Sequence, residues 1–494
     1  MKDNAITWGG LGIDSFSMSQ EVSRGHSIRQ LAVKDQTLNV FNSIGMVTDV
    51  HGSTLVCPSP TLSETKNNLV VIEQILSREN MKTALNKVVS NKGAAGVDGM
   101  SVHELALYVR THWASCRNQV LENHYLPKAI KGVYIPKPNG KKRLLGIPSV
   151  VDRLLQQAVS QQLSQIYEPH FQEHSYGFRP HRNAHQAVLQ AQANINDGYQ
   201  DIVDIDLSNF FDEVRHDVLL NLLYQKVKCQ QTLCLIRRWL KAPMQLNGKL
   251  VKRTKGVPQG SPISPLLSNI LLNELDKELE RRGHRWVRYA DDFSIYVKSK
   301  SAAKRVGNSI YKFLGKRLYL PINRSKSGLR RPVSFTILGY GFVPTYRKGE
   351  KGQYQLVASK KALVRFKQAA KALTRKTIPM SFDERIHRLK LLQTGWVNYF
   401  KLANMHGKLK KLDEWLRNRL RYCIWHHWKR PERKRKNLIR LGVPHGQAYA
   451  WSRTRMGGWA VACSPMLRTT ITLARLEKRK YVSLLDHYLR VSLV

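Results

Sequence analysis

Two adjacent aspartates, Asp291 and Asp292, lie between two apolar runs of β type in the segment RWVRYADDFSIYVKS (residues 285–299). Neighbouring carboxylates repel each other, so they are costly at a tight turn unless a cation lies beside them. Carboxylate oxygens on a rigid turn suit a hard cation such as Mg²⁺. The segment therefore predicts a β-hairpin with a metal-binding tip. The alternative interpretation is an exposed acidic tip that binds nothing.

A second acidic group ends another apolar run, in DIVDIDLSNFFD (residues 201–212). Residues two apart on a strand share a face, so Asp204 and Asp206 are expected on the same side. Two strands that each present an aspartate can bind two metal ions about 3.5–4 Å apart, as in phosphoryl and nucleotidyl transfer. The two segments together predict a two-metal site, with either Asp204 or Asp206 as a ligand.

The charge of the chain points to a polyanionic partner. Its 494 residues contain 81 Lys and Arg against 35 Asp and Glu, a formal charge of +46. Such a surplus destabilises a compact fold unless a polyanion neutralises it, and nucleic acid is the usual one. No apolar run approaches the roughly 20 residues that span a bilayer, and no secretion signal is recognisable. The six cysteines are scattered without a C-x-x-C pair. We therefore expect a soluble intracellular protein without disulfides or structural zinc.

The chain alternates between predicted helices and strands after an irregular start. Residues 1–65 are rich in Ser, Gly and Thr, and we expect them to be irregular. Helices are expected over 70–90 and 150–168, and a β-hairpin over 133–148. Residues 360–440 contain 24 Lys and Arg against five Asp and Glu, together with several aromatic residues. This pattern predicts helices with one packed face and one phosphate-binding face.

Five sequence blocks occur in an order that resembles a known family. They are IPKPNGKKRLLGIP (135–148), YGFRPHRNAHQAV (176–188), DIDLSNFFDEVRHDVLL (204–220), GVPQGSPISPLLSNILLNELD (256–276) and YADD (289–292). This set resembles the reverse transcriptases and maturases that bacterial group II introns encode. LLQTGWVNYFKLANM (391–405) and LDEWLRNRLRYCIWHHWKRP (412–431) look like the maturase, or thumb, segment of that family.

The resemblance implies an α+β fold with the architecture of a right-hand polymerase. Fingers and palm, with an antiparallel palm sheet, are expected over 70–345, and an α-helical thumb or maturase domain over 355–430. Residues 431–494 are expected to form a basic, nucleic-acid-binding region. The tail lacks the paired cysteines of the HNH endonuclease that many larger relatives carry, so we expect the short form without that module.

The resemblance also assigns roles to individual residues. Asp206 matches the first metal-binding aspartate, with Asp291 and Asp292 as the pair, so that these three are expected to be catalytic and to bind two Mg²⁺ ions. Phe211 lies five residues after Asp206 and matches the aromatic steric gate that excludes a ribose 2′-hydroxyl. This spacing favours Asp206 over Asp204 as the ligand.

Four further residues match positions that contact the incoming nucleotide or the active site. Lys137 and Arg143 match the residues that bind the triphosphate, a role suited to their charge. Gln259 matches a residue beside the nucleotide sugar, and Lys326 resembles a lysine near the active site. In the block at 176–188, Arg179 and His181 either contact the template or stabilise the fingers, and the motif alone does not decide between these roles.

The resemblance implies an RNA-directed DNA polymerase that also binds its intron RNA to promote splicing and mobility. Its expected partners are group II intron RNA, an RNA template with a DNA primer, dNTPs and target DNA. We expect it in the bacterial cytoplasm and at the nucleoid, with no membrane partner. The sequence leaves the oligomeric state open. Two alternatives stay open. One is an RNA-binding splicing maturase without polymerase activity, and the other is a domesticated reverse transcriptase in DNA repair or phage defence.

Overall fold

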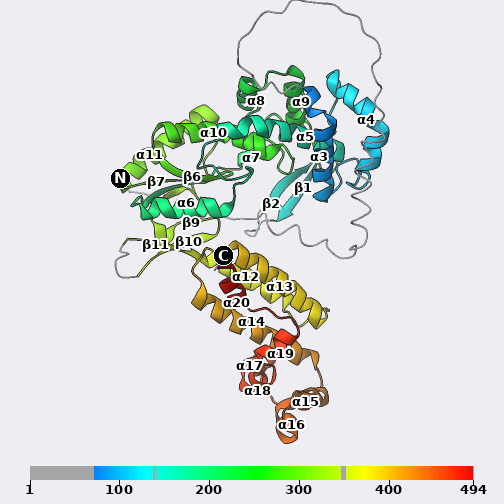
Figure 1. Cartoon of the computed structure of the whole chain (residues 1–494), viewed down its shortest axis with the longest axis vertical. Coiled ribbons are helices and arrows are strands. Elements are labelled where there is room, and N and C mark those ends of the chain that lie inside the picture. Colours follow the sequence, from blue (N-terminus) through cyan, green and yellow to red (C-terminus); the bar gives the residue numbers. More distant parts are fainter. Residues whose placement is uncertain (1–71, 137–139, 141, 347–351, 493–494) are drawn as a thin grey trace, which may run out of the picture. The chain divides into compact units, whose positions relative to one another are not determined.

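The computed structural model describes residues 72–136, 140, 142–346 and 352–492 (Figure 1). The chain forms two compact units. The first comprises the described residues up to Asn194 together with Tyr199–Arg330. The second comprises Ile195–Gly198 together with the described residues from Arg331 onward. The extension expected over residues 1–65 lies outside the described residues.

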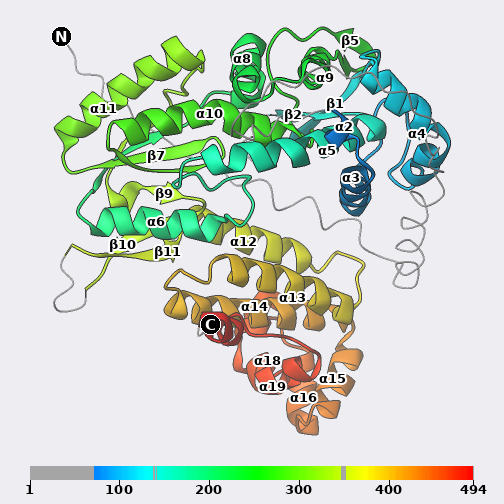
Figure 2. The same ribbon diagram turned by 45° about the horizontal axis from the view of Figure 1, so that its top comes forward.

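A four-stranded antiparallel sheet lies in the first unit, in the order β6-β7-β3-β8. Its strands are β6 (Arg285–Tyr289), β7 (Asp292–Val297), β3 (Asp201–Ile205) and β8 (Gly328–Arg330). Alternate residues of the two inner strands, Val203, Ile205, Phe293 and Ile295, are buried in the hydrophobic core. The helices α10 (Ser264–Arg281) and α11 (Lys300–Phe313) cover one face of the sheet (Figure 2).

A second sheet of this unit has the order β2-β1-β4-β5. Its strands are β1 (Ile130–Pro136), β2 (Lys142–Ile147), β4 (Met244–Leu246) and β5 (Lys249–Val251). Strands β1 and β2 form the antiparallel hairpin predicted over 133–148, and β1 pairs in parallel with β4. A small apolar cluster of Ile130, Ala242 and Met244 packs this sheet.

Helices make up most of the rest of the first unit. They are α2 (Ile72–Ile75), α3 (Arg78–Ser90), α4 (Leu105–Leu121), α5 (Val150–Tyr167), the short η1 (Glu168–His170), most of α6 (Ala184–Asn196), α7 (Phe210–Glu213), α8 (His216–Lys226), α9 (Gln230–Lys241) and the π-helical turn η2 (Leu314–Leu318). The helix predicted over 150–168 is confirmed as α5, which begins where the Ser149 hydroxyl accepts from the Asp152 amide at 3.1 Å. The single helix predicted over 70–90 is wrong, because the extended backbone of Ser77 separates α2 from α3.

The second unit begins with a three-stranded antiparallel sheet in the order β11-β10-β9 and continues as helices. The strands are β9 (Thr336–Ile337), β10 (Tyr340–Pro344) and β11 (Tyr354–Ala358), preceded by η3 (Pro332–Ser334). The long helices are α12 (Lys360–Leu373), α13 (Phe382–Tyr399) and α14 (His406–His427). The shorter ones are α15 (Pro431–Arg440), α16 (His445–Ser452), α17 (Gly458–Cys463), α18 (Pro465–Thr470), α19 (Leu473–Lys478) and α20 (Leu484–Ser492).

A buried aspartate ties the end of the chain to α14. The carboxylate of Asp413 accepts from the hydroxyls of Tyr481 and Ser483, at 3.0 and 2.8 Å, and from the amides of Leu484 and Leu485, at 2.8 and 2.9 Å. Four donors satisfy this buried charge, so α20 and α14 belong to one packed unit.

The expected fold class is confirmed. An antiparallel sheet backed by helices is followed along the chain by a helical region, as predicted for palm and thumb. No helix among the described residues combines the length and the apolar character needed to cross a bilayer.

Candidate active site

The turn between β6 and β7 carries the paired aspartates. Tyr289 pairs with Asp292 across the hairpin, which leaves Ala290 and Asp291 as a two-residue turn. Ala290 has a φ of +57°, a left-handed conformation that tight hairpin turns use. Asp291 therefore lies at the tip of the hairpin, and Asp292 is the first residue of β7.

The antiparallel register brings Asp206 to the same place. Ile205 pairs with Phe293, so the next residue of the chain, Asp206, continues opposite Asp292. The Ser327 hydroxyl accepts from the amide of Asp206 at 2.7 Å. The ammonium of Lys326 lies 3.0 Å from the Asp206 carboxylate. The three predicted catalytic aspartates and Lys326 are thus gathered at one end of the sheet.

The carboxylates of Asp291 and Asp292 resist ionisation. Asp292 reaches solvent, yet protein atoms surround it closely, and this desolvation raises its pKa well above the usual range. The negative charges of Asp291, Asp206 and Asp204 raise the pKa of Asp292 further, and Lys326 opposes them. Desolvation also raises the pKa of Asp291, and Asp206 adds to the rise. Desolvation and the mutual repulsion of the carboxylates therefore outweigh the attraction of Lys326 in setting the pKa of Asp292.

Asp204 has an environment of its own. Desolvation raises its pKa to about 6, against the nearby charge of Arg330, whose Nε lies 3.5 Å from the carboxylate. Asp206 adds a smaller upward effect. Asp204 therefore has an arginine partner, whereas Asp206 faces Lys326 and the paired aspartates. This difference supports the preference for Asp206 as a ligand.

The donor set fits Mg²⁺, although no closed ligand shell is preformed. Among the described residues, no three His, Cys, Asp or Glu side chains are arranged as ligands of one metal ion. Mg²⁺ keeps several of its waters and is bound through one or two carboxylates, so it does not need a complete protein shell. Oxygen-only donors with surplus negative charge, on two adjacent strand ends, match this requirement.

The Phe-Phe pair after Asp206 divides into a core residue and a half-buried one. Phe210 is buried in the hydrophobic core, and its ring meets that of Phe211 edge-on at 5.4 Å between centroids. The Val257 amide donates to the Phe211 carbonyl at 2.6 Å. Gly256 packs so closely that a Cβ there would lie 3.0 Å from the same carbonyl. The GVPQG segment (256–260) therefore packs against α7 through backbone contacts.

The Pro258-Gln259-Gly260 turn also packs against the β1–β2 hairpin. The Gly146 amide donates to the Gln259 carbonyl at 2.8 Å. Gly260 has a φ of +115°, and a Cβ there would lie 2.9 Å from the Gly146 carbonyl oxygen, so only glycine suits this position. The structure thus joins Gln259, Phe211 and β2 through backbone contacts.

Two of the three basic residues predicted at the site lie near the aspartates in the structure. Arg143, on β2, lies close enough to lower the pKa of Asp291 against its desolvation. Lys326 pairs with Asp206. Lys137 lies outside the described residues.

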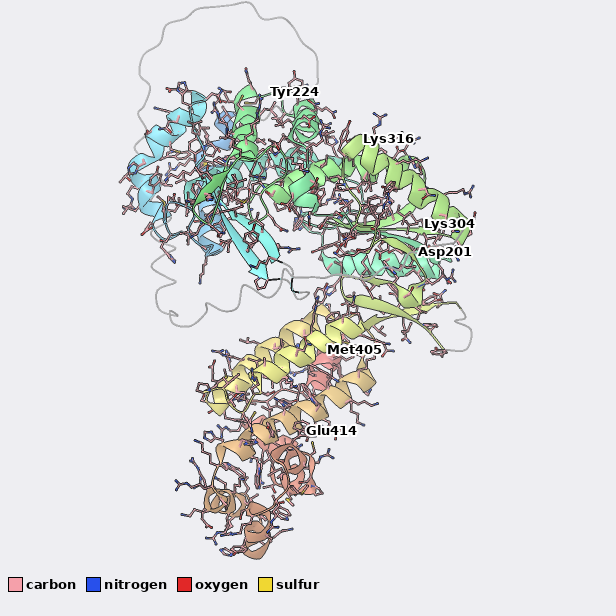
Figure 3. The ribbon with its side chains drawn as sticks, turned by 180° about the vertical axis from the view of Figure 1, so that it is seen from behind. Asp201, Tyr224, Lys304, Lys316, Met405 and Glu414 are labelled. Carbon is pink, nitrogen blue, oxygen red and sulfur yellow. The ribbon has the colours of Figure 1, made fainter. Side chains whose placement is uncertain are left out.

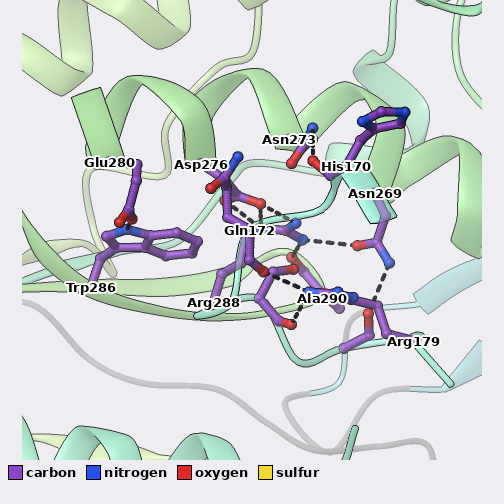
Figure 4. A network of polar contacts seen from close by, with 12 residues as sticks. His170, Gln172, Arg179, Asn269, Asn273, Asp276, Glu280, Trp286, Arg288 and Ala290 are labelled. Atoms are coloured by element: carbon purple, nitrogen blue, oxygen red, sulfur yellow. Dashed lines mark hydrogen bonds and ion pairs between the residues drawn. The ribbon is translucent and has the colours of Figure 1, made fainter. Parts of the chain in front are cut away.

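A buried arginine supports the catalytic turn from within the fold. Arg288 of β6 and Asp276 of α10 are both fully buried, and Nη2 lies 2.5 Å from the carboxylate (Figure 4). Nη1 of Arg288 donates to the Ala290 carbonyl and to the Asn269 side chain, each at 2.9 Å. The Asn269 amide group donates to the Gly177 carbonyl at 2.9 Å. One guanidinium therefore holds the left-handed turn residue and connects it to the 176–180 loop.

The sequence analysis missed Phe178, which lies in that loop. A Cβ on Gly177 would lie 2.1 Å from the Ala290 amide nitrogen, so the loop backbone touches the catalytic turn. The next residue, Phe178, has a φ of +59° and is 53% exposed. A bulky residue in this region is strained, and such strain concentrates at functional sites. The sequence signal was an aromatic residue between a glycine and an Arg-Pro pair.

Arg179 has a structural role. Its guanidinium is buried, donates to the carbonyls of Gln172 and Ser175 at 2.6 and 2.8 Å, and pairs with Glu168 at 2.8 Å. These contacts fix the loop that carries Phe178. Of the two roles left open for Arg179, the structure supports stabilisation of the fold.

Comparisons with known proteins identify the families to which the chain is similar. A family model described as reverse transcriptase (RNA-dependent DNA polymerase) matches residues 135–342, and one described as group II intron, maturase-specific domain matches residues 363–442. Protein YkfC of Escherichia coli (strain K12) is 30% identical over 330 residues, which cover 58% of this chain and 86% of YkfC.

Two further similarities cover less of the matched proteins. Group II intron-encoded protein LtrA of Lactococcus lactis subsp. cremoris is 37% identical over 202 residues, which cover 39% of this chain and 32% of LtrA. The chain therefore spans about a third of LtrA. A chain of the partial Cas6-RT-Cas1–Cas2 complex is 22% identical with a TM-score of 0.33, and the match covers 53% of this chain and 46% of that chain. This similarity is too low to define a shared arrangement.

The Arg288–Asp276 pair should be far more costly to break than a surface pair on the same helix. Asp276→Asn leaves a buried guanidinium without its counter-charge, so the free energy of unfolding should fall by about 3–5 kcal/mol. Glu278→Gln removes the partner of the more exposed Arg281 and Arg282 and should cost about 1 kcal/mol or less. Denaturant unfolding of the full chain measures both, and equal losses would contradict the assignment.

Proposed function

The chain belongs to the reverse transcriptases, the RNA-dependent DNA polymerases, of the type that carries a group II intron maturase domain, and from this premise we propose that it extends a DNA primer on an RNA template by two-metal nucleotidyl transfer. We further propose that it binds group II intron RNA to promote splicing and mobility. The observation that carries the first proposal is the convergence of Asp206 with Asp291 and Asp292, which the β3–β7 register produces.

Asp206, Asp291 and Asp292 would hold two Mg²⁺ ions. When bound, such ions lower the pKa of a primer 3′-hydroxyl and neutralise the triphosphate and the leaving pyrophosphate. The raised pKa values of Asp291 and Asp292 support this role, because a divalent cation offsets the desolvation and the mutual repulsion that raise them.

The surrounding residues would orient the nucleotide. Arg143 is near enough to Asp291 to affect its pKa, which supports binding of the triphosphate beside the metal ions, with Lys137 in the same role. Phe211 would exclude the ribose 2′-hydroxyl, because a ring beneath C2′ leaves room for hydrogen but not for oxygen. Gln259 would lie beside the sugar, and its attachment to Phe211 through the 256–260 segment supports this. Lys326 would position Asp206.

Binding of intron RNA and of target DNA would fall to the helical region. The maturase match covers α12 to α15, and residues 360–440 contain 24 Lys and Arg against five Asp and Glu, together with several aromatic residues. An intact aspartate set speaks against a maturase without polymerase activity. A domesticated role would be recognised by a reading frame that no group II intron RNA encloses.

Primer extension on an RNA template tests the polymerase proposal. Asp291→Asn and Asp206→Asn should each slow extension by on the order of 10²–10³ or more, because each removes a metal ligand. Asp201→Asn changes an aspartate at the other end of β3 (Figure 3) and should leave extension within about threefold of wild type. If Asp291→Asn and Asp201→Asn extend equally well, the proposal is wrong.

The same assay should show competition between protons and metal. The native pKa values of Asp291 and Asp292 are raised, so lowering the pH protonates these ligands before it protonates ordinary carboxylates. The Mg²⁺ concentration for half-maximal extension should therefore rise as the pH falls, and a chelator should abolish extension. A Mg²⁺ requirement that is independent of pH would contradict this.

Phe211→Ala should admit ribonucleotides. Loss of the ring opens space for the 2′-hydroxyl, so the selectivity for dNTP over the matching rNTP should fall roughly tenfold or more. Phe211→Tyr keeps the ring and should retain selectivity. The measurement is kcat/KM for each nucleotide, and unchanged discrimination in Phe211→Ala would refute the gate assignment.

We also propose that Phe178 stacks on a nucleobase or sugar of the template–primer. An exposed aromatic ring beside the catalytic turn supports this, since stacking on such rings is a general means of binding nucleic acid. Phe178→Gly should weaken template–primer binding roughly tenfold. It should leave stability equal or higher, because glycine adopts a φ of +59° without strain. Phe178→Tyr should bind as wild type. A Phe178→Gly variant that binds normally, or that unfolds more easily, would overturn the proposal.

A further inference from the structure

One segment of the first unit is basic throughout. Residues 298–330 contain ten Lys and Arg and no Asp or Glu. We define the α11 surface as the exposed basic and aromatic side chains of α11 and of the turn that follows it: Lys300, Lys304, Arg305, Tyr311, Lys312, Lys316, Arg317 and Tyr319. None of these residues belongs to the catalytic cluster.

The α11 surface is the solvent side of an amphipathic segment. Ala303, Ile310, Leu314 and Leu318 are buried in the core beneath it. The basic residues lie on the opposite side at helical spacing. Figure 3 shows Lys304 and Lys316 near opposite ends of this segment, at the edge of the first unit. Lys300 and Lys312 are separated by about 18 Å at roughly 1.5 Å per residue, a length that several phosphates of one strand can match.

The charges of this surface are uncompensated. Within the part of the chain that the structure describes, none of its six Lys and Arg residues forms an ion pair. The neighbouring helix α10 behaves differently, because Arg281 and Arg282 at its end both pair with Glu278. A row of unpaired cations on one face attracts a polyanion rather than an internal partner.

Two exposed tyrosines add a second kind of contact. Tyr311 and Tyr319 are 43% and 47% exposed, and each lies under an arginine. The Arg324 guanidinium lies 5.3 Å from the Tyr311 ring centre, and the Arg215 guanidinium lies 4.2 Å from that of Tyr319. Tyr319 follows the π-helical turn and has a φ of +56°, two irregular features that concentrate at functional sites.

We propose that the α11 surface binds folded RNA, with phosphates on its Lys and Arg residues and an unpaired base on its tyrosines. RNA is favoured over duplex DNA because loops and bulges of folded RNA supply unstacked bases, and a DNA duplex does not. This proposal rests on and deepens the RNA-binding part of the proposed function, because it adds a second RNA-binding surface outside the maturase match. It does not depend on polymerase activity.

A matched pair of triple variants of the full chain tests the phosphate contacts. Lys304→Gln/Arg305→Gln/Lys312→Gln neutralises three charges of the α11 surface. Lys226→Gln/Arg237→Gln/Lys241→Gln neutralises three exposed charges on α8 and α9. The dissociation constant for a stem-loop RNA is measured over a range of salt. The first variant should reduce the slope of log K against log salt by about 2, at roughly 0.7–0.9 per phosphate contact, and the second should leave it unchanged.

Two results would overturn the proposal. One is an equal change of slope in both triple variants, which would mean that only the total charge matters. The other is that the triple variant of the α11 surface loses as much affinity for a DNA duplex of equal length as it loses for the stem-loop RNA. Such a result would mean that the surface does not prefer RNA.

A second comparison isolates stacking. Tyr311→Leu should bind a stem-loop with an unpaired loop roughly tenfold more weakly, while Tyr311→Phe should bind as wild type. Both variants lose the hydrogen bond from Arg324 to the Tyr311 hydroxyl, so that bond cannot explain a difference between them. Neither should change binding to a fully paired RNA duplex. Equal stem-loop affinities of the Leu and Phe variants would overturn the stacking role.

Primer extension on a short template–primer separates this inference from the polymerase proposal. All α11-surface variants should extend at the wild-type rate, because their substitutions avoid the catalytic cluster. If the wild-type chain itself fails to extend, the polymerase proposal fails, while the RNA-binding comparison still decides the role of the α11 surface.

Discussion

Repulsion among carboxylates is the constraint on which the rest of the first unit depends. Desolvation and mutual charge raise the pKa of Asp291 and Asp292, so the fold must hold these groups together against their own electrostatics. Backbone pairing and a buried ion pair keep these groups in place. The ladder between β3 and β7 fixes the backbone positions, and the buried Arg288–Asp276 pair fixes the turn. A buried pair of this kind contributes little net stability, so its value here is positional.

The turn is also where backbone strain is stored. Ala290 and Phe178 both have positive φ, and the backbone of Gly177 lies so close to Ala290 that a Cβ there would be 2.1 Å from the Ala290 amide nitrogen. Each feature alone costs free energy. They are tolerated together because Arg288 and Asn269 donate to the carbonyls of Ala290 and Gly177. The same hydrogen bonds therefore fix the backbone beside the paired aspartates and the backbone of the loop that carries Phe178.

Local patterns predicted the parts of this site that depend on local chemistry. Alternation in DIVDIDL placed Asp204 and Asp206 on one face of a strand, and the apolar runs around YADD predicted the hairpin, because strand period follows from apolar patterning. The choice of Asp206 over Asp204 came from the resemblance to the group II intron reverse transcriptases. The partners of the site could not be predicted in this way. Arg288 and Asp276 are twelve positions apart on different elements, and their pairing depends on how α10 crosses β6. The break at Ser77 was missed because the apolar spacing continues through it, and only the backbone angle of Ser77 reveals it.

The overall charge and the acidic site act in opposite directions on a metal ion. The formal charge of +46 repels Mg²⁺ and the carboxylate cluster attracts it, and at physiological salt screening limits both effects to about 8 Å. A bound polyanion neutralises the nearby positive charges and brings its own counterions. Basic residues close to the catalytic turn, such as Arg143 and Lys326, therefore contribute to the conditions under which the aspartates ionise and bind metal. Nucleic acid is then part of the electrostatic environment of the site as well as its substrate.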